Sequence, residues 1–452
     1  MQKHKALLFI IIVFFLFENS QAQNNAGADS MMTIQGCVDI ALKNNLLVET
    51  SDINMQIAKV NRAQAIDNLL PQSVGISGSQ GQYSGKSLNV TNYTYVNQTI
   101  GSGSYSLSGS LQLFAGLYYQ NTIKQNKYAY DASKMDLQNQ KDNITLAVIL
   151  AYYQVLSFQE QLVIAREQVD VDAKQVDRLN LQNQAGALLI LQNLSDLQGQ
   201  FASDQGNVVN TISSLETAKI NLFQLLNIPY KRNVQYEAVP LNVDPVGYGS
   251  NPDSIFQTAV HNLPVIKSVD LKIKQFQKAL AAQRGLYYPQ LSLNGSANSN
   301  YSSANTTTSG EKIPFNQQFN NDLNTYYGVS LFIPIFNQLF RRNSVKLAKI
   351  NLHNAVLLDN GARLTLQQTV EQDYQNMLAA YGTYKSLLDQ IVAYKESFRS
   401  AEIRFNEGVI TSDLYLLAMN NIDRANTNMA AAKYNYLFRT KILDYYEGRL
   451  MW

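Results

Sequence analysis

The 452-residue chain has one cysteine, Cys37, and three histidines, so it offers few side chains that bind metals or act as nucleophiles. A single cysteine excludes an intrachain disulfide and a cysteine-based metal site. Charged residues are 15% of the chain and the net charge is +2, which gives no support for nucleic-acid binding. No Walker-type glycine loop and no constellation of nucleophile and base occurs. We therefore expect a protein that is not an enzyme, with no catalytic, metal or cofactor site.

Long apolar runs are also scarce, and the clearest one stands at the N-terminus. Lys3 and Lys5 precede an apolar run over residues 6–17, and Ser20-Gln21-Ala22 follows it. A basic start, a short apolar stretch and small residues are typical of a cleaved secretory signal. The alternative is a membrane anchor, but the run is shorter than the roughly 20 residues that a spanning helix needs. We expect a signal peptide at 1–22, an exported mature chain, and no helix that spans a membrane.

The rest of the sequence repeats itself. Leu70-Pro71-Gln72 returns as Tyr288-Pro289-Gln290 after 218 residues, and Leu113-Phe114 returns as Ile335-Phe336 after 222. An internal duplication of this size indicates two copies of one structural unit. We place the first repeat at 23–228 and the second at 254–452. A connector at 229–253 is rich in proline, and we expect it to be irregular apart from a short strand near Val234–Tyr236.

Each repeat contains two segments with a period of two residues. In the clearest one, serines alternate with Tyr105, Leu107, Leu111 and Leu113. A transmembrane β-strand needs about 9–11 residues with an apolar lipid face and a polar lumen face. An ordinary sheet edge is the alternative for any one strand, but four such segments at duplicated positions disfavour it. We expect strands at about 72–83, 103–114, 290–301 and 326–336, with loops at 84–102 and 301–325. The residues expected to face lipid are Tyr105, Leu107, Leu111, Leu113, Val329 and Leu331.

A long heptad pattern follows the second strand of each repeat. Val148, Val155 and Leu162 fall seven residues apart, as do Val370 and Met377 in the second repeat. Sustained heptads predict coiled-coil packing. We expect long helices at about 118–184 and 340–406, ended by Gly186 and Gly408, and return helices at 188–226 and 411–447. Asp170 and Asp172 lie on the first long helix and are interpreted as solvated or interhelical charges, and Cys37 is expected on the buried face of a short helix.

Several short motifs occur in a specific order within this duplication. They include Ala41-Leu42-Lys43-Asn44-Asn45, Leu113-Phe114-Ala115-Gly116 and Phe405-Asn406-Glu407-Gly408. Together they resemble the outer-membrane efflux protein family, the TolC-like channels. The resemblance implies an α+β membrane protein whose four strands per chain join a trimeric 12-stranded outer-membrane β-barrel. It also implies that a long periplasmic coiled-coil barrel of helices continues this β-barrel.

The resemblance also implies a function and partners. The homotrimer would be the passive exit duct of a tripartite efflux pump or a type I secretion system in a Gram-negative outer membrane. Its partners would be outer-membrane lipid, a periplasmic adaptor (membrane fusion) protein and an inner-membrane transporter of RND or ABC type. The cargo would be small molecules, such as drugs and toxic compounds, or proteins. The alternative function is a secreted coiled-coil structural or adhesin-like surface protein whose strands form a soluble cap.

The glycines that end the long helices mark the expected periplasmic tips. The residues expected to meet the adaptor are Gly186, Ala187, Leu188, Gly408, Val409 and Ile410. These apolar turns also have a plainer interpretation, which is packing against each other across the hairpin. Candidates to line the periplasmic entrance are Asn193, Ser195, Asp413, Leu414 and Leu417. The family often carries acidic residues at the positions of Leu414 and Leu417, and this chain departs from that pattern. We therefore expect packing and neutral hydrogen bonds to close the entrance. Asp413 would line the entrance only if the helix is rotated by one residue.

Overall fold

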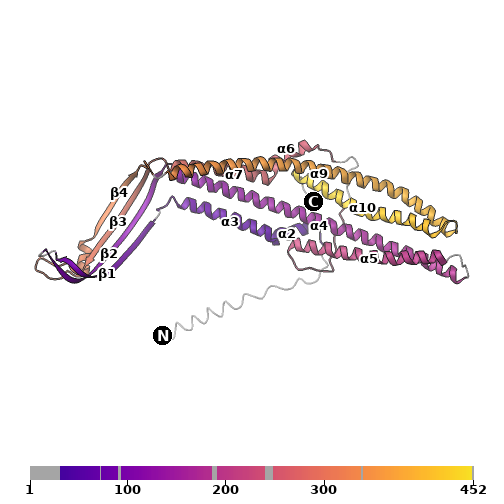
Figure 1. Cartoon of the computed structure of the whole chain (residues 1–452), viewed down its shortest axis with the longest axis horizontal. Coiled ribbons are helices and arrows are strands. Elements are labelled where there is room, and N and C mark those ends of the chain that lie inside the picture. The colour runs from indigo at the N-terminus through magenta and orange to yellow at the C-terminus, as the bar shows by residue number, and fades with distance from the viewer. Residues whose placement is uncertain are drawn as a thin grey trace, which may run out of the picture.

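The computed structural model describes residues 31–71, 73–89, 93–185, 191–239, 248–336 and 339–449. The expected signal peptide therefore lies outside the described residues. The molecule is elongated, with a four-stranded sheet at one end and two pairs of long helices that reach the other end (Figure 1). This arrangement has the duplicated helices and strands that the sequence predicts.

The two repeats follow the same order of elements, except that the second has an additional short helix, α8, between its strands. In the first repeat these are α2 (Ile34–Asn44), α3 (Leu46–Asp67), β1 (Ser73–Asn89), β2 (Thr94–Ala115), α4 (Tyr118–Gln184) and α5 (Leu191–Leu226). In the second they are α6 (Pro252–Asn262), α7 (Pro264–Gly285), β3 (Gln290–Ser302), α8 (Phe315–Asn321), β4 (Asn324–Phe332), α9 (Phe340–Asn406) and α10 (Ser412–Tyr446). At about 1.5 Å per residue, α4 and α9 are each on the order of 100 Å long.

The strands form one antiparallel sheet in the order β1-β2-β3-β4. β1 and β2 are much longer than the sequence predicted, because their pairing continues to Asn89 and Thr94. The expected loop at 84–102 was therefore wrong. Its serines, threonines and glycines are turn formers by composition, but here they extend a two-stranded ribbon. The expected loop at 301–325 contains the short helix α8, and β4 ends at Phe332, two residues before Pro334.

A tight corner turns each second strand into a long helix. Leu117 and Leu339, which are 222 residues apart, both have left-handed backbone conformations with φ of 63° and 62°. Gly116, beside the first of these, also has a positive φ, and a Cβ atom there would lie 1.9 Å from the Gly285 carbonyl oxygen. The close approach of these backbones explains why glycine stands before α4, since any side chain would collide with the end of α7.

The helices pack along a continuous apolar core. α4 contacts α3, α5, α7 and α10, and α9 contacts α7 and α10. The heptad residues Val148, Val155, Val370 and Met377 are all at most 1% exposed. Cys37 of α2 is fully buried in the same core, and this burial raises the pKa of its thiol to about 12. The coiled-coil pattern thus marks the buried faces of these helices correctly.

By length and composition, one helix among the described residues, α4, carries a stretch that could cross a membrane. We expected no such stretch beyond the N-terminus. Half of it is buried within the chain, and Ile149, Tyr152 and Tyr153 of the same helix are at most 2% exposed. Packing against neighbouring helices explains the apolar character of this segment, since a core helix passes the same test as a spanning one.

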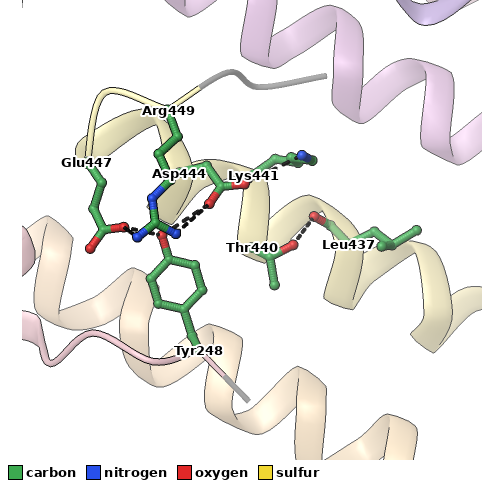
Figure 2. Close-up of polar contacts among 7 residues, drawn as sticks. All are labelled: Tyr248, Leu437, Thr440, Lys441, Asp444, Glu447 and Arg449. Carbon is green, nitrogen blue, oxygen red and sulfur yellow. Dashed lines mark hydrogen bonds and ion pairs between the residues drawn. The ribbon is translucent and has the colours of Figure 1, made fainter. Parts of the chain in front are cut away.

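The connector between the repeats is fixed at both of its described ends. Tyr236 forms an isolated parallel bridge with Met32, so the strand expected near Val234–Tyr236 is reduced to a single bridged residue. At the other end the Tyr248 hydroxyl lies 3.0 Å from Glu447 Oε2 and 3.2 Å from Asp444 Oδ1 (Figure 2). Arg449 forms an ion pair with Glu447 at 2.7 Å. These contacts tie the connector to the C-terminal end of α10.

Candidate functional site

One face of the sheet is apolar across all four strands. Residues directly opposite each other in antiparallel strands project to the same side. The register places Leu111 opposite Leu293, and Leu293 opposite Val329. Four residues further along β2 on the same face, Leu107 lies opposite Ile76. Because every second residue projects to this side, these apolar side chains form one continuous surface.

The opposite face of the sheet is polar. Ser77 and Ser106 hydrogen-bond across β1 and β2 at 2.7 Å, and Asn294 donates to Ser330 across β3 and β4 at 2.9 Å. Side-chain pairs of this kind stabilise a sheet surface that faces water. A sheet with one apolar and one polar face, each extending over all four strands, separates an apolar medium from an aqueous one.

The six residues expected to face lipid differ in their exposure and in what lies against them. Leu107, Val329 and Leu331 are 47%, 61% and 62% exposed, whereas Leu111 is half-buried. Leu113 lies where the register with β3 shifts, so that Phe114 comes opposite Leu291. The Tyr105 ring is covered by α8, whose Phe315 and Phe319 rings lie 5.7 and 5.8 Å away. The sequence did not predict this helix, because α8 spans only seven residues within a polar loop.

The turn after α9 has the geometry expected of a helix-ending glycine. Gly408 has φ of 70°, and its N–H donates to Phe405 O, while Val409 N–H donates to Arg404 O at 2.8 Å. This pair of bonds is the Schellman motif, in which glycine takes the left-handed position. Val409 is 65% exposed, whereas Ile410 is half-buried against a second apolar cluster that includes Phe405, Tyr415 and Met419. Gly186, Ala187 and Leu188 lie outside the described residues.

A polar junction joins α5 and α10 close to this turn. Asn193 Oδ1 accepts from the backbone N–H of Ser412, and the Ser412 hydroxyl donates to Asp196 Oδ2 at 2.6 Å. The side chain of Thr411, the N-cap of α10, makes no capping hydrogen bond. Asn193 of the neighbouring helix α5 accepts a hydrogen bond from the first turn of α10 instead. Ser195 is exposed and bonds only to Leu191 O of its own helix.

The other entrance candidates lie on the free surface of α10. Leu414 and Leu417 are 50% and 57% exposed. Asp413 is also exposed, and a hydrogen bond from the Thr411 hydroxyl holds its pKa below the usual value. Asp413 and Leu417 are one helical turn apart, so they share a face. The carboxylate and both leucines thus stay accessible near the start of α10, while Asn193 is engaged within the chain.

Three aspartates, from α4, α5 and α10, lie close together where these helices pack. Asp172 of α4 is 2% exposed, so it is not a solvated charge. Its Oδ1 accepts from Gln168 at 2.9 Å, whereas its buried Oδ2 has no hydrogen-bond partner. Burial raises the pKa of Asp172, and the adjacent Asp204 of α5 raises it further. Burial and the charge of Asp204 raise the pKa of Asp423 on α10 to about 7. Carboxyl groups in such surroundings hold protons near neutral pH.

A sheet with one apolar and one polar face beside long paired helices is the arrangement expected of a protein whose sheet meets a membrane. Residues 37–227 and 255–443 match the family model for Outer membrane efflux protein. The chain therefore belongs to the outer membrane efflux protein family. It is a TolC-like efflux channel of the Gram-negative outer membrane with its helices in the periplasm, so the predictions of fold, function class and location are confirmed. The alternative of an adhesin-like protein is set aside.

Relatives and solved structures agree with this assignment. The chain is 23% identical over 409 residues to Toxin and drug export protein A of Aggregatibacter actinomycetemcomitans, covering 88% of this chain and 82% of that one. It is 23% identical over 361 residues to Outer membrane protein TolC of Escherichia coli, covering 76% and 70%. The outer membrane protein VceC of Vibrio cholerae has the same fold, with a TM-score of 0.75, 12% identity, and coverage of 93% and 97%. The CmeC channel of Campylobacter jejuni gives a TM-score of 0.72, 19% identity, and coverage of 95% and 90%.

Proposed function

We propose that three copies of this chain close a 12-stranded barrel through the outer membrane, with Tyr105, Leu107, Leu111, Leu113, Val329 and Leu331 on its outer wall. The observation that supports this most is the open sheet. Among the residues that the structure describes, β1 and β4 each pair with a single neighbour, so both have an unpaired edge within one chain. Lipid does not tolerate open sheet edges, because it offers no partner for backbone groups. Pairing of β1 with β4 of the next copy removes every edge.

The helices of the three copies then form a tube that leads from the periplasm to the barrel. We place the adaptor protein at the tips, on the turns around Gly186 and Gly408 with their flanking Ala187, Leu188, Val409 and Ile410. The exposed Val409 supports this for the second tip, because exposed apolar groups often mark docking surfaces. At the entrance we place Leu414 and Leu417 of α10, with Asn193 and Ser195 of α5 beside them. Asp413 would line it only if α10 is rotated by one residue.

The duct is passive and exports cargo that an inner-membrane transporter of RND or ABC type drives. The sequence contains no Walker-type glycine loop that would bind ATP, so we assign the supply of energy to that partner. Toxins and drugs are the proposed cargo, because a relative that shares most of the chain's length is a toxin and drug export protein.

Cysteine cross-linking tests the edge pairing. In one chain β1 and β4 are three strand spacings apart, about 14 Å, whereas disulfides need Cα atoms within about 7 Å. We would replace Cys37 by serine, then combine Ile76→Cys with Tyr327→Cys, Val329→Cys or Leu331→Cys in turn. We expect one register to give covalently closed trimers on denaturing gels, and single cysteines to give none. Monomers for every pair, together with a monomeric mass in detergent, would reject the barrel.

A further inference from the structure

The short helix α8 covers the apolar face of the sheet near its outer end. Ser299, which lies opposite Tyr105 on this face, donates to Phe319 O at 2.8 Å. Two residues further along β3, the Tyr301 ring lies 5.3 Å from the Phe315 ring. Contacts from Tyr105, Ser299 and Tyr301 thus place α8 on the side that carries the apolar surface, and not on the polar side.

A buried glutamine locks this helix to the sheet. Gln318 is 2% exposed. Its Oε1 accepts from the Ser302 N–H at 2.9 Å, and its Nε2 donates to Ser302 O at 3.0 Å and to Ile313 O at 2.7 Å. All these bonds hold the loop between β3 and β4 against the end of β3. The outward residues of α8 are uncharged amides, namely Asn316, Gln317, Asn320 and Asn321, and all are exposed.

The length of the apolar surface gives the height at which α8 lies. Tyr105 and Phe114 are nine residues apart on β2, which is about 30 Å along a strand at about 3.3 Å per residue. A strand tilted by about 35–45° converts this to roughly 21–25 Å across the membrane, which is the height of the apolar band of outer-membrane barrels. Aromatic residues flank such bands at both interfaces. Tyr105, Phe315 and Phe319 therefore lie at one margin, on the side where β1 and β2 continue outward.

We propose that α8 is a collar in the headgroup layer of the outer leaflet, where its amide side chains hydrogen-bond to the sugars of glycolipids. Phe315, at 44% exposed, reaches the lipid side of this layer. Amides match sugar hydroxyls because they both donate and accept hydrogen bonds, and they carry no charge that the layer would have to compensate. This inference rests on the proposed barrel, and it adds the level at which the membrane surface meets the chain.

Depth-dependent quenching in the full-length protein tests the collar. In a Cys37→Ser background, single cysteines would replace Gln317, Leu331 and Tyr93, and each would carry the same fluorophore. Tyr93 directly precedes β2, at the end of the sheet that is far from the helices. The trimers would be reconstituted in vesicles that contain lipopolysaccharide and lipids spin-labelled at the headgroup or deep in the chain. Iodide would report access from water. We expect position 317 to be quenched most by the headgroup label, position 331 by the chain label, and position 93 by iodide alone.

The outcomes separate the collar from the barrel. Quenching of position 317 by iodide to the level of position 93, without lipid quenching, would overturn the collar. Shielding of position 317 from all three quenchers would overturn it in favour of burial by a neighbouring copy. Chain-label quenching at position 331 in either case keeps the barrel, and its loss would reject the barrel itself. Replacing lipopolysaccharide with phospholipid should increase iodide quenching at position 317 but not at 331, and no change would reject the contact with sugars.

Discussion

The Ser412 hydroxyl on α10 donates to Asp196 Oδ2 on α5 across 2.6 Å, joining the two repeats close to the turn at Gly408. A hydrogen bond to a charged group contributes about 1.5–3 kcal/mol. We therefore expect Ser412→Ala to lower the free energy of local opening at this tip by that amount. Amide hydrogen exchange over the first turns of α5 and α10 measures it. Ser195→Ala is the matched control, because Ser195 bonds only within its own helix. Equal exchange in both variants would contradict the role of this junction.

Leu111 and Ser110 are neighbours on opposite faces of β2, and they test the assignment of the faces. A cation on the lipid face near the midplane costs about 2–4 kcal/mol, while lumen positions tolerate charge. We expect Leu111→Lys to reduce assembly in the outer membrane far more than Ser110→Lys. The amount of trimer in isolated outer membranes is the measurement. Equal tolerance of both substitutions would mean that neither face meets lipid.

Gly408 provides a test of the turn after α9. A Cβ atom at this position meets nothing within 4 Å, so only the positive φ opposes a side chain. Left-handed backbone costs most residues about 1–2 kcal/mol, and asparagine less. We expect Gly408→Ala to lower the thermal stability of the tip more than Gly408→Asn. The bulky Gly408→Trp should abolish export while trimers persist. Wild-type drug tolerance in a strain carrying it would argue against an adaptor contact.

The buried Asp172 and the half-buried Asp423 make the stability of the helical part depend on pH. Asp423 has a folded-state pKa of about 7, above its ordinary value of 3.8, and the pKa of Asp172 is also raised. The folded state therefore binds more protons than the unfolded state between these values, so stability falls as pH rises. The stability that these two carboxyl groups contribute by binding protons is complete below about pH 4. That contribution is lost as the pH rises through about 7. We expect Asp172→Asn and Asp423→Asn to flatten this decline in thermal unfolding followed from pH 5 to 8. Asp170→Asn, two residues away at an exposed position on the other side of α4, should leave it unchanged.

Asp413 decides whether the entrance carries an acidic ring. Packing of Leu414 and Leu417 is the expected closure, since an unpaired carboxylate in a narrow dry tip is costly. We expect single-channel conductance of the purified trimer to show little blockade by divalent cations. A blockade that disappears in Asp413→Asn would place a ring of carboxylates in the lumen and shift our register by one residue.

Strand lengths and side-chain networks were harder to infer than the long helices. The heptads at Val148, Val155 and Val370 predicted buried faces because that spacing recurs over many turns. The ribbon beyond Tyr83 was missed, since Gly, Ser and Thr favour turns locally and only pairing between β1 and β2 makes them extended. Asp172 was interpreted as a solvated or an interhelical charge, and the structure selects the interhelical alternative, because α5 and α10 cover this position. Nothing within one helix could decide between the two.

The duplication, the coiled-coil period and the alternation in the strands were determined by the sequence alone. Periods of 2 and 3.6 residues reflect which face each element buries, and they need no knowledge of neighbours. Only the tertiary structure brought Asn193 and Asp196 to Ser412, grouped Asp172 with Asp204 and Asp423, and laid α8 over Tyr105. These contacts join residues that are far apart in sequence or lie in a loop without periodicity, so only the packing of the two repeats decides them.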